Sequence, residues 1–369
     1  MKRICIVTAA RSEYGVLRWV IDEVYHEKDL ELQLVVTGAH LSSEQGMTVQ
    51  YIEQDGYPIA ERVPILLHGD DEVGIAKTMG ICSIMIADSF QRLKPDIVVV
   101  LGDRYELLPI VSTALIMRIP VAHISGGDVT EGAIDDEVRN AVSMMSTFHF
   151  PGVEESAKNL HRMLGTEQNV FIVGEPGLDN FLRMNLWNKE KVAEELNLDI
   201  RKKWALVTLH PETKLSMVDN VQMVRNLYEA MRETHDIQFV ITKANTDASG
   251  SEINKFWTEV VANNTNMQLY SSLGQVRYLS FMKYADMVLG NSSSGIIEAP
   301  FLGTPVVNIG NRQKGRHLCP NVVSCNNSKE DISLAITKAQ SAVRIIDSYW
   351  GDGQSSKRIV SEIKKQLMH

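Results

Sequence analysis

Residues 97–117 read IVVVLGDRYELLPIVSTALIM and show the repeating unit of this 369-residue chain. Five consecutive apolar residues, Ile97–Leu101, are typical of a strand that is buried on both faces of a sheet. The polar cluster Gly102–Glu106 follows at once, and a helical pattern extends over Tyr105–Met117. The stretch therefore predicts a β-α unit of a parallel sheet.

The same alternation of short apolar runs and helix-length segments continues along the chain. In the first half, we expect strands at Ile4–Thr8, Leu32–Thr37, Ile97–Leu101, Val121–Ile124 and Val170–Val173, and helices at Tyr14–Glu27, Glu72–Lys94, Tyr105–Met117 and Asp135–Met145. In the second half, we expect strands at Trp204–Leu209, Gln238–Thr242, Met267–Tyr270, Met287–Leu289 and Val306–Ile309. Because the polar stretch Asn185–Ile200 separates the two sets, the sequence predicts two doubly wound α/β domains, residues 1–184 and 185–354.

The composition is that of a soluble globular protein, with 44% hydrophobic and 22% charged residues. A net charge of −9 argues against a nucleic-acid partner, whose phosphates require a basic surface. The four cysteines have no metal-ligand spacing and are expected to be reduced. The first apolar run is too short for a signal peptide, and no run approaches a membrane span, so we expect a cytoplasmic protein without a membrane partner.

Polar and glycine-rich clusters follow many of the predicted strands. In open parallel sheets, ligands bind beyond the carboxyl ends of the strands. Six such ends carry clusters, at Thr8–Gly15, Gly102–Glu106, Ser125–Asp128, His210–Thr213, Gly290–Gly295 and Gly310–Arg316. Any one of these could be ordinary turn chemistry, but six at the expected ligand face predict a binding site.

The cluster Gly290–Gly295 precedes an apolar segment expected to be a helix, Ile296–Leu302. Backbone N–H groups at a helix N-terminus attract phosphate, and serine hydroxyls add further donors. The alternative is an ordinary Asn/Ser helix cap that needs no ligand. Glu298, near the start of this helix, could bond ribose hydroxyls or simply stabilise the helix dipole.

Charged residues at other strand ends could bind an anionic ligand or take part in proton transfer. Arg11 and Arg316 could bind a diphosphate, because a guanidinium is always charged and binds oxygens bidentately; a lone surface arginine is the alternative. His210 could act as a general acid or base, as a donor to substrate, or as a structural histidine.

Four carboxylates lie at or just after neighbouring strand ends, namely Asp103, Asp128, Asp135 and Asp136. Such groups can remove a proton, protonate a leaving group and stabilise an oxocarbenium-like centre. For Asp135 and Asp136 the alternative is a helix cap with a first-turn acid, and Asp103 could instead form a structural ion pair with Arg104.

Several motifs of cofactor enzymes are missing from the sequence. No Gly-x-Gly-x-x-Gly follows the first strand, there is no Walker loop, and no compact His/Cys/Asp set has metal-ligand spacing. We therefore expect the reaction to use side chains alone, with no cofactor and no metal.

Taken together, the motifs resemble those of the hydrolysing UDP-N-acetylglucosamine 2-epimerases of sialic acid and related nonulosonate biosynthesis. The resemblance rests on Arg11–Gly15, Gly102–Glu106, His210–Thr213, Gly290–Gly295 and Asn308–Arg316, and it extends to Trp350–Gly353 near the end of the chain. It implies a GT-B-like fold of two Rossmann-like domains with a cleft between them, and a last helix over residues 355–368 that crosses back to the first domain. It also implies a homo-oligomer, either a dimer or a tetramer.

The resemblance implies a reaction as well. UDP leaves C1 by anti elimination with loss of the C2 proton, and water then adds to the 2-acetamidoglycal to give free N-acetylmannosamine. The matching catalytic residues are Asp103, Asp128, Asp136 and His210. The residues expected to bind the UDP-sugar substrate are Arg11, Arg104, Asp135, Asn291, Ser292, Ser293, Ser294, Gly295, Glu298, Arg312 and Arg316.

Three positions in the stretch Ser125–Asn140 depart from the family pattern. The family usually has Glu where this chain has Asp128, and it often has His at the positions of Ser125 and Asn140. The sugar could therefore be a 2,4-diacetamido-trideoxy hexose of the legionaminic acid route, or the change could be neutral; we favour UDP-N-acetylglucosamine.

Three other functions remain open. A non-hydrolysing epimerase would resemble relatives that carry Gly-Thr-Arg-Pro-Glu where this chain has Ala10–Glu13. A GT-B glycosyltransferase would need an acceptor site, and a non-catalytic sugar-nucleotide sensor would not need the carboxylates.

Overall fold

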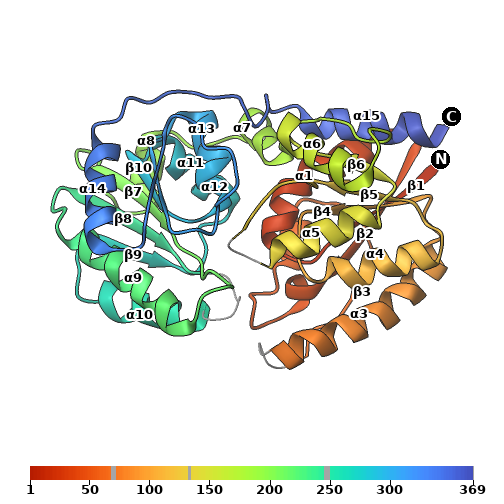
Figure 1. Cartoon of the computed structure of the whole chain (residues 1–369), viewed down its shortest axis with the longest axis horizontal. Coiled ribbons are helices and arrows are strands. Elements are labelled where there is room, and N and C mark those ends of the chain that lie inside the picture. The colour runs from red at the N-terminus through yellow and green to blue at the C-terminus, as the bar shows by residue number, and fades with distance from the viewer. Residues whose placement is uncertain (68–71, 132–133, 245–249, 369) are drawn as a thin grey trace. The chain divides into compact units, whose positions relative to one another are not determined.

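Two parallel sheets of six strands each organise the chain (Figure 1). The computed structural model describes residues 1–67, 72–131, 134–244 and 250–368. The chain divides into two units, each built around one sheet. Unit 1 comprises residues 1–128, 135–182 and 351–369, and unit 2 comprises residues 129–134 and 183–350.

Unit 1 alternates strands and helices. Its strands are β1 (Lys2–Thr8), β2 (Leu30–Thr37), β3 (Ile59–Val63), β4 (Ile97–Leu101), β5 (Val121–Ile124) and β6 (Phe148–Phe150). Its helices are α1 (Arg11–His26), α2 (Val49–Gln54), α3 (Glu72–Leu93), α4 (Leu107–Ile116), α5 (Asp135–Met144), α6 (Glu154–Leu164), α7 (Asp179–Arg183) and α15 (Ser355–Met368), with short 3₁₀ turns at Gly38–Leu41 and Pro176–Leu178. The strand order is β3-β2-β1-β4-β5-β6. The order in which consecutive strands are added to the sheet reverses between β1 and β4, and doubly wound sheets bind ligands at such a point.

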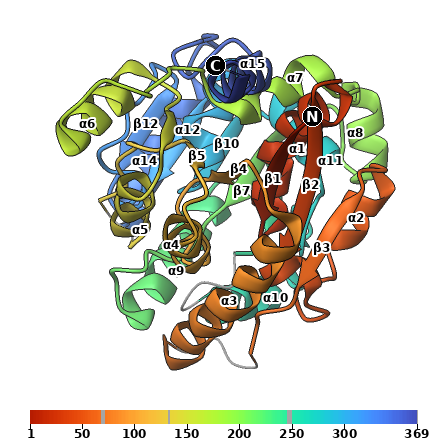
Figure 2. The ribbon, with the colours of Figure 1, turned by 90° about the vertical axis from the view of Figure 1, so that its right-hand side faces the viewer.

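Helices cover both faces of this sheet. On one face, α1 and α15 pack against apolar side chains of β1, β2 and β4, and the two helices contact each other although they lie at opposite ends of the chain. On the other face, α3, α4 and α5 pack on the same strands (Figure 2). The central strands are therefore buried on both sides, which explains their nearly continuous apolar sequences.

Unit 2 repeats this plan. Its strands are β7 (Lys203–Thr208), β8 (Ile237–Thr242), β9 (Met267–Tyr270), β10 (Met287–Gly290), β11 (Val306–Ile309) and β12 (Val322–Cys325). Its helices are α8 (Lys189–Glu195), α9 (Met217–Arg232), α10 (Gly250–Val261), α11 (Gln275–Tyr284), α12 (Ser293–Ile296), α13 (Glu298–Leu302) and α14 (Lys329–Gln340). The order β12-β11-β10-β7-β8-β9 reverses between β7 and β10, so the two sheets share one topology.

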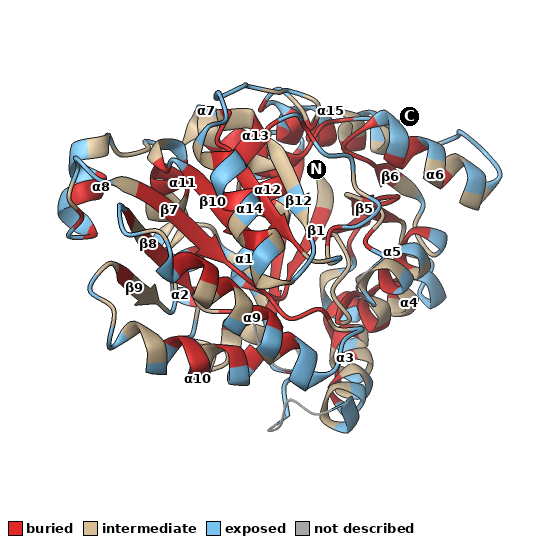
Figure 3. Cartoon of the chain, turned by 60° about the vertical axis from the view of Figure 1, so that its left-hand side comes forward, coloured by how far each residue is buried: buried red, intermediate tan, exposed pale blue. Residues whose placement is uncertain are grey.

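The core of unit 2 also has two layers. Apolar residues of α9, α10 and α14 pack on one face of the sheet, and those of α8, α11 and α13 pack on the other. The burial colouring of Figure 3 shows β7 and β10 as buried strands between these layers.

The expected α/β fold with doubly wound sheets is confirmed. Apart from Val170–Val173, each expected strand is observed with its ends within two residues of the prediction. The edge strands β3, β6 and β12 were not predicted, because they are short or carry polar residues on an exposed side.

Two predicted elements are wrong for reasons connected with proline. Val170–Val173 makes only an isolated bridge to His149, because the neighbouring strand runs into Pro151, which has no N–H to continue the ladder. The expected helix Ile296–Leu302 is two short helices, α12 and α13, interrupted at Ile297. Pro300 accounts for the break, since its ring and missing N–H disrupt the preceding helical turn.

Helix α3 is the one helix among the described residues that is long and apolar enough to cross a membrane, with a mean hydropathy of 1.4. Length and composition alone are weak evidence of a span. Cys82, Ile86 and Phe90 on this helix are buried against the sheet of unit 1. The opposite side of the helix carries exposed apolar residues, including Ile84.

Candidate active site

Gly290 brings the ends of two neighbouring strands of unit 2 together. It has a φ of 133°, and a Cβ atom at this position would lie 2.0 Å from the carbonyl oxygen of Thr208. Only glycine fits here, because both the backbone angle and the close approach exclude a side chain. The end of β10 is thus held against the end of β7, at the reversal point of the sheet.

Asn291 clamps the backbone of His210. Its Oδ1 accepts the N–H of His210 at 2.8 Å, and its Nδ2 donates to the carbonyl oxygen of the same residue at 2.8 Å. Both residues are buried. The predicted substrate ligand Asn291 therefore uses its amide group inside the protein, where it positions His210.

The loop after β11 is tied to the other two loops. Glu212 Oε1 accepts the backbone N–H groups of Asn311 at 2.7 Å and Arg312 at 3.2 Å. Arg312 Nη1 and Gln313 Nε2 both donate to the carbonyl oxygen of Asn291, at 3.3 Å and 2.9 Å. The loops after β7, β10 and β11, which the sequence singled out separately, thus form one connected polar group.

The three serines of this group differ in their surroundings. Ser292 caps α12, and its Oγ accepts both the N–H of Ser294 at 3.4 Å and the hydroxyl of Ser294 at 3.1 Å. Ser294 and Gly295 are buried, whereas Ser292 and Ser293 are partly exposed. The capping alternative is therefore confirmed for Ser292, whose own hydroxyl hydrogen is still able to bond a ligand.

Burial sets the protonation of two candidate residues in unit 2. It lowers the pKa of His210 to about 3, with a further contribution from the charge of Arg312. His210 is therefore a neutral imidazole at pH 7. Burial also raises the pKa of Glu298 to about 7, against the opposing effect of Arg316. Within the part of the chain that the structure describes, the buried Glu298 Oε2 has no hydrogen-bond partner.

In unit 1, Arg139 gathers the predicted catalytic carboxylate residues. This side chain is only 1% exposed, and it bonds the carboxylates of Asp103 and Asp136, the latter at 3.1 Å. Its Nη1 also donates to the carbonyl oxygen of Asp128 at 2.9 Å. Burial lowers the pKa of Arg139, but the surrounding carboxylates outweigh this effect and raise it overall. Sequence reasoning missed Arg139; its i, i+3 spacing from Asp136 was the available signal.

Asp128 lies in a tight loop after β5. Its Oδ1 accepts the hydroxyl of Ser156 at 2.7 Å. A Cβ atom on the preceding Gly127 would lie 2.2 Å from the carbonyl oxygen of Ser156, so this loop requires glycine. Of the other two positions that depart from the family pattern, Ser125 donates to Glu175 Oε2 at 3.0 Å, and Asn140 is exposed on α5.

The remaining predicted residues of unit 1 lie at helix starts and strand ends. Arg11 is exposed at the first position of α1. Glu13 Oε2 accepts the N–H groups of Ala9 at 2.7 Å and Ala10 at 3.0 Å, which fixes the loop that carries Arg11. Burial raises the pKa of Glu13 to about 7.

Arg104 and Asp135 complete the predicted set. Arg104 forms a two-pronged ion pair with the buried carboxylate of Glu106, at 3.1 Å and 2.7 Å. Asp135 is the first residue of α5, and Asp136 is the second, so both are first-turn acids and neither is the cap that the alternative included. Their position in the first turn does not prevent Asp136 from also bonding Arg139.

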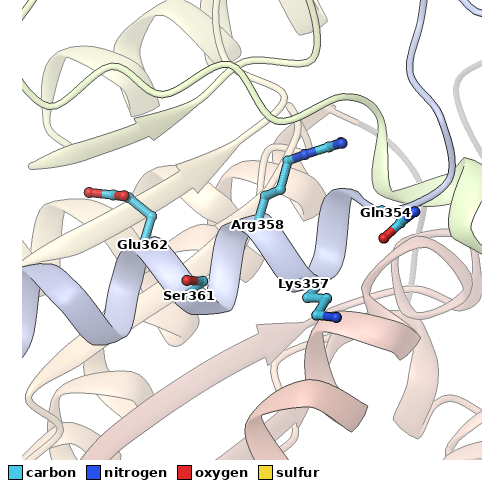
Figure 4. A pocket seen from close by; sticks show the side chains of 5 residues that line it. All are labelled: Gln354, Lys357, Arg358, Ser361 and Glu362. Carbon is cyan, nitrogen blue, oxygen red and sulfur yellow. The ribbon is translucent and has the colours of Figure 1, made fainter.

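The remaining features of the structure concern metal binding and a surface depression away from these residues. Among the described residues, no group of three or more His, Cys, Asp or Glu side chains could hold a metal ion. A shallow depression on α15 is lined by Gln354, Lys357, Arg358, Ser361 and Glu362 (Figure 4). Four of these side chains lie on α15 and Gln354 directly precedes it, and the set includes none of the predicted site residues.

Two doubly wound parallel sheets, with polar loops concentrated at the ends of their central strands, place the chain among the Rossmann-like α/β proteins. A family model described as UDP-N-acetylglucosamine 2-epimerase matches residues 22–364, and the chain belongs to this family. The expected resemblance is therefore confirmed.

Individual relatives agree with this assignment. The chain is 39% identical over 341 residues to a GDP/UDP-N,N'-diacetylbacillosamine 2-epimerase (hydrolyzing) of Campylobacter jejuni, with 92% of this chain and 88% of that protein covered. It is 30% identical over 371 residues to a UDP-N,N'-diacetylbacillosamine 2-epimerase (hydrolyzing) of Legionella pneumophila, with 100% and 97% covered.

A solved structure shows the same fold. The UDP-GlcNAc 2-epimerase of Neisseria meningitidis, crystallised with UDP-GlcNAc, superimposes with a TM-score of 0.84 at 19% sequence identity, covering 99% of this chain and 100% of that one. The expected GT-B-like fold of two Rossmann-like domains is confirmed.

Proposed function

We propose that the protein is a hydrolysing UDP-sugar 2-epimerase of sialic-acid-type sugar biosynthesis. The observation that carries this proposal is the grouping of Asp103, Asp136 and the backbone of Asp128 around Arg139 at the strand ends of unit 1. Membership of the UDP-N-acetylglucosamine 2-epimerase family supplies the reaction class.

The proposed reaction breaks the C2–H bond and the C1–O bond to UDP, which gives a 2-acetamidoglycal and UDP. Water then adds across the double bond and releases the free sugar with inverted C2. The C2 proton becomes more acidic as positive charge develops at C1, so a carboxylate is suited to remove it. Asp103, Asp128 and Asp136 are the candidates for this proton transfer.

The loops of unit 2 are proposed to hold the UDP group. Ser292 and Ser293 offer hydroxyl donors, and Arg312 and Arg316 supply charge for the leaving diphosphate. Because the pKa of His210 lies far below 7, we assign its neutral ring to hydrogen bonding rather than to charge neutralisation. Glu298 is proposed to accept the ribose hydroxyls.

The sugar is the finer part of the proposal. The Campylobacter and Legionella relatives are both named for UDP-N,N'-diacetylbacillosamine, and both align over more than nine-tenths of this chain. We therefore favour UDP-2,4-diacetamido-2,4,6-trideoxy hexose as the substrate, with UDP-N-acetylglucosamine as the second candidate. The replacements at Ser125, Asp128 and Asn140 are the sequence feature that first raised this alternative.

Incubation with each UDP-sugar in D₂O, followed by NMR, tests the proposal. We expect free UDP and a free 2-epimerised sugar that carries deuterium at C2, formed faster from the diacetamido substrate. Release of UDP without deuterium at C2 would contradict elimination. Formation of the UDP-linked epimer would indicate a non-hydrolysing enzyme, and absence of turnover with bound UDP would indicate a sensor.

We further propose a cytoplasmic homo-oligomer, associated through the outer face of α3 and α4. These two helices contact each other and expose Ile84, Leu115 and Ile116, with 69%, 51% and 82% of their surface accessible. A contiguous apolar patch on the surface marks an interaction site, and we propose that these three side chains belong to one. Light scattering should give the mass of a dimer or tetramer, and Ile84→Arg should lower it; a monomeric wild type would contradict the proposal.

A further inference from the structure

A row of five hydroxyl groups runs through unit 2 from the sheet to the serine loop. Thr242 Oγ1 lies 2.9 Å from Thr208 Oγ1, which lies 3.3 Å from Tyr278 Oη. Tyr278 Oη lies 2.7 Å from Ser294 Oγ, and Ser294 Oγ donates to Ser292 Oγ at 3.1 Å. The row thus connects the ends of β7 and β8 to the cap of α12 through one side chain of α11.

The hydrogen bonds of this row have a defined direction at its outer end. Ser292 Oγ accepts the N–H and the hydroxyl of Ser294, so the hydrogen of its own hydroxyl is left to donate elsewhere. Because the hydroxyl of Ser294 donates its hydrogen bond to Ser292, the oxygen of Ser294 is the acceptor for the hydroxyl of Tyr278. A phenol is also a stronger donor than an alkyl hydroxyl, which favours the same direction.

The surroundings keep Tyr278 in its donor form. Burial, opposed by its hydrogen bonds to Ser294 and Thr208, raises the pKa of Tyr278 above its usual value. The phenol therefore retains its proton at neutral pH. In a row of aligned hydrogen bonds each donor strengthens the next, so the bond from Tyr278 makes the hydroxyl of Ser292 a better donor.

We propose that Tyr278 is a positioning residue for phosphate binding: it orders the hydroxyls of Ser294 and Ser292 so that Ser292 presents its hydrogen to a diphosphate oxygen of the UDP-sugar. This inference rests on the proposed function. Tyr278 itself is placed one residue behind the ligand, because its hydroxyl is engaged by Ser294 and Thr208.

Tyr278→Phe tests the role, because it removes the hydroxyl and keeps the ring. We expect UDP to bind about fivefold more weakly, which corresponds to about 1 kcal/mol for one polarised hydrogen bond. Calorimetry measures UDP binding, and NMR titration measures uridine, which lacks phosphate and should bind unchanged. Tyr284→Phe, on the same helix, is the matched control and should bind UDP as the wild type does.

Non-additivity distinguishes positioning from a direct contact. The double variant Tyr278→Phe/Ser292→Ala should bind UDP no more weakly than Ser292→Ala alone, because the two residues act through one hydrogen bond. If Tyr278→Phe does not fold, Ser294→Ala breaks the same row and should give the same selective loss.

Three results would overturn the inference. Unchanged UDP affinity in Tyr278→Phe would exclude the positioning role, and equal losses for UDP and uridine would show a general structural role instead. A wild-type protein that binds no UDP would refute the proposed function and this role together. A wild type that binds UDP, with an unaffected Tyr278→Phe, would refute the positioning role alone.

Discussion

Replacing Arg139 by glutamine removes the cation around which the carboxylates of unit 1 are arranged. The guanidinium is only 1% exposed, and its two carboxylate partners, Asp103 and Asp136, are 28% and 26% exposed. Removing one partner of a buried ion pair costs about 3–5 kcal/mol, because the remaining charges lose their compensation. Since water reaches both carboxylates in part, we expect the lower end of this range, about 3 kcal/mol.

The consequence for Arg139→Gln is a melting temperature lower by about 6–12 °C, taking about 2–4 °C per kcal/mol for a domain of roughly 200 residues. Differential scanning calorimetry at pH 7 measures the change. Turnover should fall as well, because Asp103 and Asp136 lose the group that sets their separation. Arg162→Gln, at an exposed position of α6, is the control and should change stability by less than about 0.5 kcal/mol.

A double-mutant cycle makes the reasoning refutable. In the Arg139→Gln variant the carboxylate of Asp103 is left without its cation, and Asp103→Asn removes that charge. The double variant should therefore be destabilised by less than the sum of the two single losses, by about 1 kcal/mol or more. Additive losses would show that the two side chains do not interact. A melting temperature of Arg139→Gln within about 2 °C of the wild type would show that the buried cation does not support this part of the fold.

Three further predictions follow from the same geometry. Asp103→Asn should abolish turnover but retain UDP binding by calorimetry; a collapse of UDP affinity would make Asp103 structural. Gly290→Ala should destabilise the protein by about 3 kcal/mol or more because its Cβ would meet the carbonyl of Thr208, whereas Gly274→Ala, with no neighbour within 4 Å, should cost about 1 kcal/mol; equal losses would contradict the steric argument. Burial lowers the pKa of His40, His123 and His149 to about 4 and that of His210 to about 3, so the unfolded chain binds more protons and stability should fall as the pH drops from 6.5 towards 4. Glu13 and Glu298, with pKa values raised to about 7, act in the opposite sense between pH 4.5 and 7, but they are fewer; thermal melts that show no loss of stability between pH 6.5 and 5 would contradict the balance.

The sequence predicts the central strands well, because they are buried on both faces and therefore form unbroken apolar runs. It predicts the edges poorly. β3 reads Ile-Ala-Glu-Arg-Val, and its successive side chains alternate between partly buried and exposed positions. β6 has only three residues. Neither strand therefore forms the continuous apolar run that is typical of a buried strand. Pro300 could have predicted the helix break at Ile297. The isolated bridge of Val170 could not be predicted locally, because it depends on which strand lies beside it.

The candidate site divides along a similar line. Position along a parallel sheet predicts which loops share an edge, and in unit 2 the loops after β7, β10 and β11 are indeed joined by hydrogen bonds. Position does not predict which polar group faces the ligand and which faces the protein. Asn291, a predicted substrate-binding residue, bonds the backbone of His210 through its side-chain amide, and Tyr278 was not among the predicted residues.

Arg139 shows why the distinction matters for mechanism. Asp103 and Arg139 are 36 residues apart in sequence, so no local pattern pairs them, and only the packing of α5 beside α4 brings them together. Each of the two carboxylates, Asp103 and Asp136, contacts the buried Arg139 and is also partly exposed to solvent. A carboxylate that must take a proton from carbon needs a fixed position and an accessible oxygen. Arg139 fixes Asp103 and Asp136 from the buried side and leaves about a quarter of each side chain exposed, an arrangement that agrees with the role proposed for them.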